Sequence, residues 1–484
     1  MLAATSDSLT VEDLRANFFA VACAGIALRA IVSLHSYSGS GTPPMYGDYE
    51  AQRHWQELTV NIPVIEWYKN SSNNNLQYWG LDYPPLTAYH SYFMGKLAYT
   101  LNSSYVVLKK SHGIETASHK TFMRLTVLAA DVILYIPSAM LFAVSVGKIF
   151  DQQYTLPALV IILIYPGQIL VDNGHFQYNN ISLGLTTLAV VCICREWHFF
   201  SSLLFTLAIN YKQMELYHSI PFFMYILGLC VSKKRFFSHL VLNAITVMMT
   251  CIILWFPWIL TLNSFKEVAS RIFPLARGVY EDKVANFWCA VNIVVKLKLI
   301  SNQQLAKICA FSTFLSVTPT ATNLYQKATK WNFVYSLFNC ALGFYLFSFQ
   351  VHEKSILLVA LPATALYYEH PFLITWFLQL TTCSMIPLFI KDDLLLPSII
   401  MYIIFYLTCN LLGVFDSRKM CSLMSCLHIL SNFIIWVVII CQLLAPTPVK
   451  LPHLFTVILL LFIFFHFVIF FVFFTMKQLR LLEK

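Results

Sequence analysis

Long apolar runs separated by short polar connectors make up most of the chain. A helix that spans a bilayer needs about 20 apolar residues, and about fourteen runs approach this length. The pattern therefore predicts an all-α, polytopic membrane protein. The predicted spans are 14–34, 121–147, 154–171, 178–194, 197–211, 214–231, 237–260, 304–321, 332–350, 354–370, 371–390, 395–413, 421–444 and 452–476.

Residues 84–102 form an ambiguous segment, because they begin with two prolines and carry His90 and Lys96. Such a segment could span the membrane or lie along its surface as an amphipathic helix. Retained Lys and Arg mark the cytoplasmic side, and one extra span would move every later basic cluster to the other side. We therefore expect a flat interfacial helix and one long non-cytoplasmic loop over residues 35–120. The basic clusters are at 233–235, 327–330, 418–419 and 477–484.

Composition supports the membrane class. Hydrophobic residues make up 58% of the 484 residues, charged residues only 11%, and the mean hydropathy is +0.66. No soluble globule hides that much apolar surface. The net charge of +9 fits cytoplasmic Lys and Arg better than nucleic-acid binding, because no basic stretch is interleaved with aromatic residues. The 13 cysteines include no C-x-x-C pair and are expected to be small apolar residues within helices.

The block Met45–Ser91 differs from the rest of the chain by gathering charged and aromatic residues. Asp48 and Glu50 flank one tyrosine, and such a pair could share a divalent cation. A carboxylate at the edge of a membrane cavity could equally act as a general base, and a solvated loop acid is the ordinary alternative. The neighbouring aromatic side chains suit the faces of sugars. They are Trp55, Trp67, Tyr78, Trp79 and Tyr83.

Four further polar clusters interrupt the apolar runs on the same predicted side of the membrane: 172–179, 210–215, 262–303 and 352–354. Together with the first loop they predict one composite site at the luminal face. A transporter would more typically place polar residues in the middle of its helices and show internal repeats, neither of which is seen. Five cationic side chains are candidates for holding an anion. They are His352, Lys354, Lys212, Arg271 and Arg277.

Five motifs carry a resemblance to a known family. The runs GDYEAQRHWQELT, LQYWGLDYPPLTAYHS, DNGHFQYNNISLGL, NYKQMELY and FSFQVHEKSILLVALP resemble the dolichyl-phosphate-glucose-dependent glucosyltransferases of the endoplasmic reticulum. The resemblance covers about residues 45–370, and the last hundred residues match only as apolar spans. GLDYPPLTAYHS and QVHEKSILL fit the branch that adds the first glucose better than the sibling branch that adds the second.

This resemblance implies a GT-C fold, with luminal catalytic loops and interfacial helices, in the endoplasmic reticulum membrane. Residues 1–390 would form the catalytic module and residues 391–484 the C-terminal transmembrane helices. The donor would be dolichyl phosphate glucose, the acceptor Man9GlcNAc2-PP-dolichol, and the surroundings membrane lipid. No cofactor and no metal are expected, because cationic side chains can stabilise a monophosphate leaving group.

The resemblance also implies roles for individual residues. The reaction inverts a β-linked donor to an α-1,3 product and needs one base, which by its motif position is Asp48. His352 would contact the departing dolichyl phosphate, with Lys354, Lys212, Arg271 and Arg277 as helpers. The residues expected to contact substrate are Glu50, Arg53, His54, Trp55, Trp79, Asp82, Tyr83, His175 and Gln177.

Overall fold

Helices account for nearly all of the regular structure in this computed structural model. Within the described residues no β-strand occurs, and one isolated bridge pairs Ser71 with Asn74. The described stretches are 11–232, 236–274, 283–416 and 422–480. Outside them lie the predicted anion ligand Arg277 and several basic positions of the topology prediction, namely 233–235, 418–419 and Lys484.

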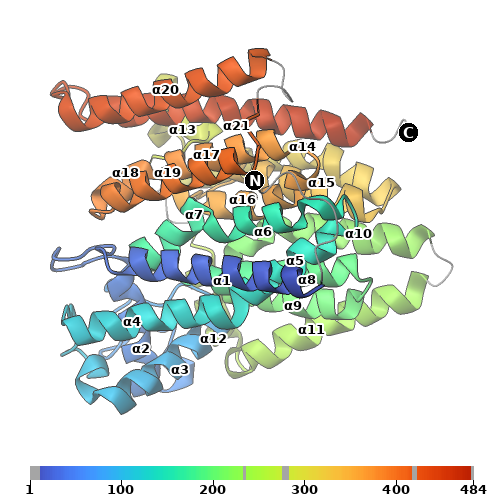
Figure 1. The fold of residues 1–484 in the computed structure, drawn as a ribbon. Coiled ribbons are helices and arrows are strands. Elements are labelled where there is room, and N and C mark those ends of the chain that lie inside the picture. The colour runs from blue at the N-terminus through green and yellow to red at the C-terminus, as the bar shows by residue number, and fades with distance from the viewer. Residues whose placement is uncertain (1–10, 233–235, 275–282, 417–421, 481–484) are drawn as a thin grey trace.

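The long helices run side by side (Figure 1). Each of the predicted apolar runs coincides with one helix or with consecutive helical segments, of which η3 and η5 are π-helical. In chain order these elements are α1 (Val11–Ser33); α4 (Ala117–Ala130), η3 (Asp131–Tyr135) and α5 (Ile136–Gly147); η4 (Gln152–Tyr154), α6 (Thr155–Ile164), α7 (Pro166–Ile169) and η5 (Leu170–Phe176); α8 (Asn179–Cys194); α9 (His198–Tyr211); η6 (Gln213–His218) and α10 (Ser219–Ser232); α11 (Phe236–Ile259); α14 (Asn302–Gln326); α15 (Lys330–Phe347); η8 (Glu353–Ile356), α16 (Leu357–Ala365) and η9 (Leu366–Tyr368); α17 (Pro371–Ser384) and α18 (Ile386–Lys391); α19 (Leu395–Leu411); α20 (Ser422–Leu444); and α21 (Leu454–Arg480).

Eight segments are long and apolar enough to cross a membrane, judged by length and composition over the described residues. The helices α8 and α19 are also apolar but shorter. The prediction of an all-helical, polytopic membrane protein is therefore confirmed, whereas the number of fourteen spans stays a prediction. The eight segments are Arg15–Ser33, Ala117–Gly147, Gln152–Phe176, Gln213–Ser232, Ser238–Ile259, Pro371–Lys391, Ser422–Leu444 and Leu454–Arg480.

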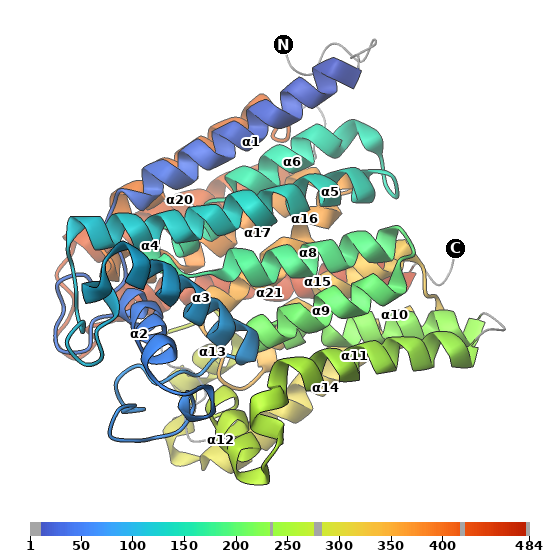
Figure 2. The same cartoon turned by 90° about the horizontal axis from the view of Figure 1, so that it is seen from below.

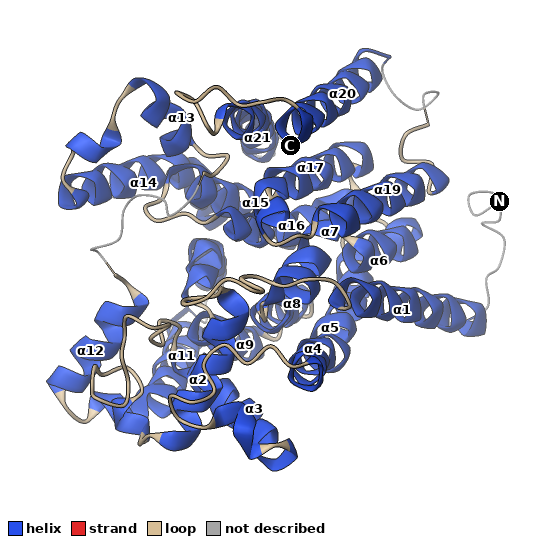
Figure 3. Ribbon diagram, turned by 90° about the vertical axis from the view of Figure 1, so that its left-hand side faces the viewer, coloured by secondary structure: helices blue, strands red, loops and turns tan. Residues whose placement is uncertain are grey.

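Three helices from the predicted luminal loops lie at one end of the bundle. These are α2 (Asp48–Asn61), α3 (Pro85–Leu101) and α12 (Leu262–Ile272), and Figure 3 looks onto this end. The C-terminal end of α21 lies at the opposite end, as Figure 2 shows. The helices of the predicted luminal loops and the end of the predicted cytoplasmic tail thus lie at opposite ends of the bundle, and which end faces the lumen stays a prediction. The remaining short elements are η1 (Val64–Glu66), η2 (Ser103–Val106), α13 (Phe287–Val294) and η7 (Leu297–Leu299).

The helix expected near residues 84–102 is α3. Pro85 occupies its first turn, where the missing N–H is no loss, and Pro84 before it is extended. The helix packs closely on α2, because a Cβ atom on Gly95 would lie 2.7 Å from the carbonyl oxygen of Gln56. It is not among the candidate spans of the described residues. Its predicted orientation along the membrane surface stays a prediction.

A buried ion pair and the hydrogen bonds of its arginine join four helical segments inside the bundle. The Arg29 Nε atom of α1 lies 3.2 Å from the Asp131 Oδ1 atom of η3, and both side chains are fully buried. The same guanidinium donates to the Leu163 carbonyl at 2.8 Å and to the Gln168 Oε1 atom at 2.7 Å. A charge in an apolar interior is tolerated only with such partners, so this arginine fixes how α1 sits on η3, α6 and α7.

We expect Arg29→Leu to destabilise the protein strongly, because it leaves the Asp131 carboxylate buried without its counter-charge. The loss of unfolding free energy should be about 3–5 kcal/mol. The double variant Arg29→Leu/Asp131→Leu should recover a large part of that loss. Thermal unfolding of the purified variants in one detergent measures both effects. A double variant less stable than Arg29→Leu would contradict this account of the pair.

Candidate active site

The Asp48 carboxylate, at the first residue of α2, is the centre of the polar cluster at the predicted luminal end. Its Oδ2 atom accepts a hydrogen bond from the Lys354 Nζ atom at 2.6 Å and lies 3.0 Å from the His175 Nε2 atom. The Gln177 side-chain amide donates to the same oxygen. The Asp48 side chain is 24% exposed, so substrate can still reach it. The structure thus brings together residues from three of the predicted motifs.

A π-helical turn supplies the two contacts that come from the 170–177 region. It ends at Phe176, whose φ of 88° lies in the left-handed region and redirects the chain. The Asp172 carboxylate anchors this turn by accepting from the backbone N–H groups of Asn179 at 3.2 Å and Asn180 at 2.8 Å. A carboxylate is favourable there because these amides form the positive end of α8.

Lys212 adds a second cation behind the cluster. It follows α9 directly, and its Nζ atom donates to the Gln177 Oε1 atom at 3.1 Å and to the Asn179 side chain. The ammonium also lies 5.3 Å from the centre of the Tyr83 ring, a distance suited to a cation–π contact. Lys212 therefore touches Asp48 only through Gln177.

The electrostatics of the cluster keep Asp48 ionised. Burial on its own would raise the pKa of Asp48, but the Lys354 ammonium and the bonded His175 ring outweigh it and hold that pKa well below its usual range. Burial and the like charge of Lys354 lower the pKa of Lys212 to about 8. A bound anion would favour the charged form of Lys212, so the site is suited to receiving negative charge.

Asp392 also belongs to this cluster, and the sequence analysis missed it. Its Oδ2 atom is hydrogen-bonded to the His175 Nδ1 atom, and the residue is only 5% exposed. Asp392 lies in the short connector between α18 and α19, and none of the predicted polar clusters includes it. The predicted topology could have indicated Asp392, because the predicted series of spans places residues 391–394 on the luminal side.

Several residues predicted to bind substrate are engaged in packing within the first loop. The Arg53 guanidinium donates to both Glu50 oxygens at 2.7 Å and to the Ser111 hydroxyl at 2.7 Å, and Tyr78 donates to Glu50 at 2.8 Å. The carboxylates of Asp48 and Glu50 therefore have separate partners and do not converge on a shared cation. The substrate-binding roles of Glu50 and Arg53 stay predictions.

The one group of described residues with metal-ligand geometry is His54, Glu57 and His112, whose ligand atoms lie within 4.8 Å of one another. The Glu57 oxygens already accept from the Lys109 backbone N–H at 2.6 Å and the Ser111 hydroxyl at 2.8 Å. The fully buried Arg53 guanidinium is 2.7 Å from Glu57 as well. A divalent cation there would meet a neighbouring positive charge, so we assign no metal to this group.

Aromatic residues from the two first-loop motifs contact one another. The Trp55 indole donates to the Trp79 carbonyl at 2.9 Å, and the Trp55 and Tyr83 ring centres are 5.0 Å apart. The Trp79 indole donates to the Met45 carbonyl. The backbone carbonyl of Asp82 accepts from Gln213 at 3.3 Å, which ties this strip to η6. Contact with sugar at these positions stays a prediction.

The predicted anion ligands differ in where they lie. The Arg271 guanidinium donates to the backbone carbonyls of Gly80 at 2.7 Å and Leu81 at 3.2 Å, so it braces the segment that leads to Asp82 and Tyr83. His352 lies two residues before Lys354, at the start of η8. Lys354 and Lys212 reach the Asp48 cluster; the phosphate-binding roles of all these residues stay predictions.

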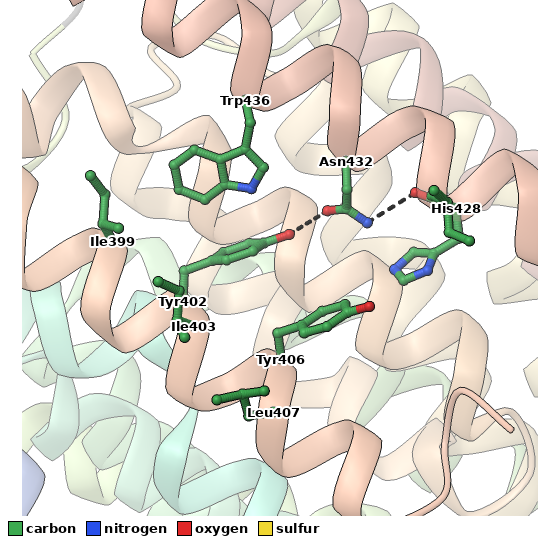
Figure 4. A pocket seen from close by; sticks show the side chains of 9 residues that line it. Ile399, Tyr402, Ile403, Tyr406, Leu407, His428, Asn432 and Trp436 are labelled. Carbon is green, nitrogen blue, oxygen red and sulfur yellow. Dashed lines mark hydrogen bonds between the residues drawn. The ribbon is translucent and has the colours of Figure 1, made fainter.

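A cavity of about 390 Å³ lies elsewhere, between α19 and α20 (Figure 4). Aliphatic and aromatic side chains form most of its wall, and Asn432 and His428 are among its polar residues. No residue that contacts Asp48 lines it. The cavity is therefore separate from the candidate active site.

Comparison with known proteins gives the family. The sequence model of the ALG6, ALG8 glycosyltransferase family matches residues 25–474. The chain belongs to this family. The ALG6, ALG8 match extends through most of the C-terminal helices, beyond the 45–370 over which motifs are recognisable. Family membership and the apolar helices together make the chain a multi-pass membrane glycosyltransferase.

Three relatives show how much of the chain is shared within the ALG6, ALG8 family. A Drosophila melanogaster protein named probable dolichyl pyrophosphate Man9GlcNAc2 alpha-1,3-glucosyltransferase is 49% identical over 92% of this chain and 95% of its own length. The Rattus norvegicus protein named dolichyl pyrophosphate Man9GlcNAc2 alpha-1,3-glucosyltransferase is 49% identical over 80% of this chain and 77% of its own. The Caenorhabditis elegans protein with the same name, marked probable, is 38% identical over 93% and 86%.

We expect Glu57→Gln to reduce stability at pH 7 and to flatten its acid dependence. Burial raises the pKa of Glu57, but the His54 ring, 3.6 Å from its carboxylate, and the charge of Arg53 outweigh it and lower the pKa to about 2. Against an unfolded value of about 4.3, this ionised carboxylate contributes about 3 kcal/mol above pH 5. That contribution is lost as the pH falls from about 4.3 towards 2.

Thermal unfolding in detergent at pH 7 and pH 3 measures this effect. Wild type should lose more stability between the two values than Glu57→Gln does. Glu66→Gln, in the same loop, is the matched control and should follow wild type. Equal acid sensitivity of wild type and Glu57→Gln would show that another group carries the dependence.

Proposed function

We propose that this chain transfers glucose from dolichyl phosphate glucose to the terminal mannose of Man9GlcNAc2-PP-dolichol, in α-1,3 linkage, at the luminal face of the endoplasmic reticulum membrane. The observation that carries the proposal is the ionised, partly exposed Asp48 carboxylate held between Lys354 and His175. The names of the relatives at 38–49% identity agree with this reaction and favour it over addition of the second glucose.

Asp48 is suited to the role of general base. Its contacts with Lys354, His175 and Gln177 all go to Oδ2. Within the described part of the chain, Oδ1 has no hydrogen-bond partner. Oδ1 can therefore accept the proton of the mannose 3-hydroxyl. For this step the hydroxyl must lie within hydrogen-bond reach of Oδ1. The mannose oxygen then attacks the anomeric carbon of glucose from the face opposite the phosphate.

The leaving group takes the electron pair of the breaking bond between the anomeric carbon and the phosphate oxygen. Lys354 lies beside the base and can donate a charge-assisted hydrogen bond to this phosphate, with Lys212 behind it and His352 two residues away. A phosphate that draws the Lys354 ammonium towards itself also weakens the hydrogen bond between Lys354 and Asp48. Donor binding thus raises the basicity of the Asp48 carboxylate at the stage when the acceptor hydroxyl must lose its proton.

We expect Asp48→Asn to reduce glucose transfer by about 10²–10⁴-fold, because the amide cannot take the hydroxyl proton. The assay supplies dolichyl phosphate glucose and lipid-linked Man9 acceptor to purified enzyme in detergent. Asp151→Asn, the same substitution at an exposed acid in the loop before η4, is the control and should transfer at the wild-type rate. Near-normal transfer by a folded Asp48→Asn variant would remove Asp48 from this role.

The same assay separates the first-glucose from the second-glucose reaction. Transfer to the unglucosylated acceptor alone supports the proposal. Transfer only to the monoglucosylated acceptor would assign the second step. No transfer to either acceptor by the folded protein would overturn the proposed function.

We expect Lys354→Met to lower kcat/KM for the donor by about 10²–10³-fold, the usual cost of removing one donor that stabilises developing negative charge. Lys354→Arg keeps the charge and should retain part of the activity. Lys307→Met, at an exposed lysine of α14, is the matched control and should leave kcat/KM unchanged. Initial rates at varied donor and saturating acceptor measure the effect. A Lys354→Met variant as active as the control would contradict the assignment.

A further inference from the structure

We propose that Asp392 is a positioning residue for the transfer reaction, and that it acts by holding the His175 ring against Asp48. The inference rests on the proposed function, because its readout is glucose transfer. It adds a residue from the connector between α18 and α19 to a site otherwise built from the first loop, the end of η5 and η8. None of the five sequence motifs that indicate the family includes Asp392.

The three side chains form a continuous hydrogen-bonded chain. The Asp392 Oδ2 atom is bonded to His175 Nδ1, and His175 Nε2 lies 3.0 Å from Asp48 Oδ2. The His175 and Asp392 side chains are only 3% and 2% exposed. With both ring nitrogens occupied by carboxylates on opposite edges, the ring has one orientation that satisfies it.

Asp392 determines which nitrogen of the ring carries a proton. An ionised carboxylate only accepts hydrogen bonds, so Nδ1 must be the donor towards Asp392. Nε2 then faces Asp48 and also lies 3.1 Å from the Lys354 Nζ atom. A protonated ring donates to both carboxylates, whereas a neutral ring donates to Asp392 alone and accepts from Lys354 at Nε2. In both states the bond to Asp392 fixes the orientation of the ring, so that Nε2 stays between Asp48 and Lys354. Carboxylates orient other functional histidines in the same way.

The local backbone gives Asp392 no other evident task. It is the C-terminal cap of α18, with its backbone N–H on the Leu388 carbonyl at 3.1 Å. A carboxylate at the C-terminal end of a helix is electrostatically unfavourable, so helix stability does not explain this acid. The next residue, Asp393, has a φ of 58° and reverses the chain towards α19. It is exposed and carries the same charge, which makes it a matched control.

The test compares Asp392→Asn with Asp393→Asn in the transfer assay. Asp392→Asn should lower kcat by about 10–100-fold, the loss seen when a carboxylate that orients a metal-binding histidine is removed. The KM values for donor and acceptor should stay within about twofold, because Asp392 touches neither substrate. Asp393→Asn should match wild type. Asp392→Glu, which keeps the charge and the acceptor, should lie between them.

A double-mutant cycle with His175→Ala separates positioning from a general structural role. If Asp392 acts only through His175, adding Asp392→Asn to His175→Ala should cause no further loss of kcat. Losses that multiply would overturn the proposal, and so would a normal kcat for Asp392→Asn. Thermal unfolding establishes that each variant is folded. If Asp392→Asn does not fold, Asp392→Glu alone and with His175→Ala completes the cycle, under the same criteria.

The outcomes also separate this inference from the proposed function. Activity lost in Asp48→Asn but normal in Asp392→Asn overturns only the role of Asp392. Full activity in Asp48→Asn overturns the proposed role of the base itself, whatever Asp392→Asn does.

Discussion

Charge placed where water cannot reach it is the constraint on which this structure depends. The Arg29 guanidinium, fully buried, lies on Asp131 and also donates to Gln168. The Gln168 amide in turn donates to Asp172 at 3.0 Å. Each group in the chain has a polar partner because an apolar interior offers no alternative. The result is a rigid polar spine inside an otherwise apolar bundle.

The spine ends at the candidate active site. Asp172 holds the start of α8 through backbone amides, and the π-helical turn that carries it also carries His175. The positions of His175 and Gln177 beside Asp48 are thus set from within the bundle, whereas Asp48 comes from a loop outside it. Catalytic geometry of this kind requires support on both sides, since small displacements of a base are costly.

Sequence reasoning located the helices well and the site in part. Apolar run length is set by the bilayer, so each predicted run coincides with helical structure, but the π-helical turns at 131–135 and 170–176 were not foreseen because tertiary hydrogen bonds decide them. Motif position pointed to Asp48, His175, Gln177 and Lys354 together. The helix α2 is buried from Tyr49 to Thr59, so no periodicity could separate the side chain that joins the cluster, Asp48, from those that bond to one another within the first loop, such as Glu50 and Arg53. Asp392 was missed because a short charged connector carries no pattern of its own.

The separation of the site residues along the chain has a consequence for biosynthesis. The Asp48–Lys354 contact joins residues 306 positions apart, and the His175–Asp392 contact joins residues 217 apart. Asp48 is synthesised early, and it has no Lys354 counter-charge while most of the helices are synthesised and inserted. The set of partners around Asp48 and His175 is complete only when Asp392, which follows α18, has been added. A chain that ends before Asp392 therefore lacks part of this cluster.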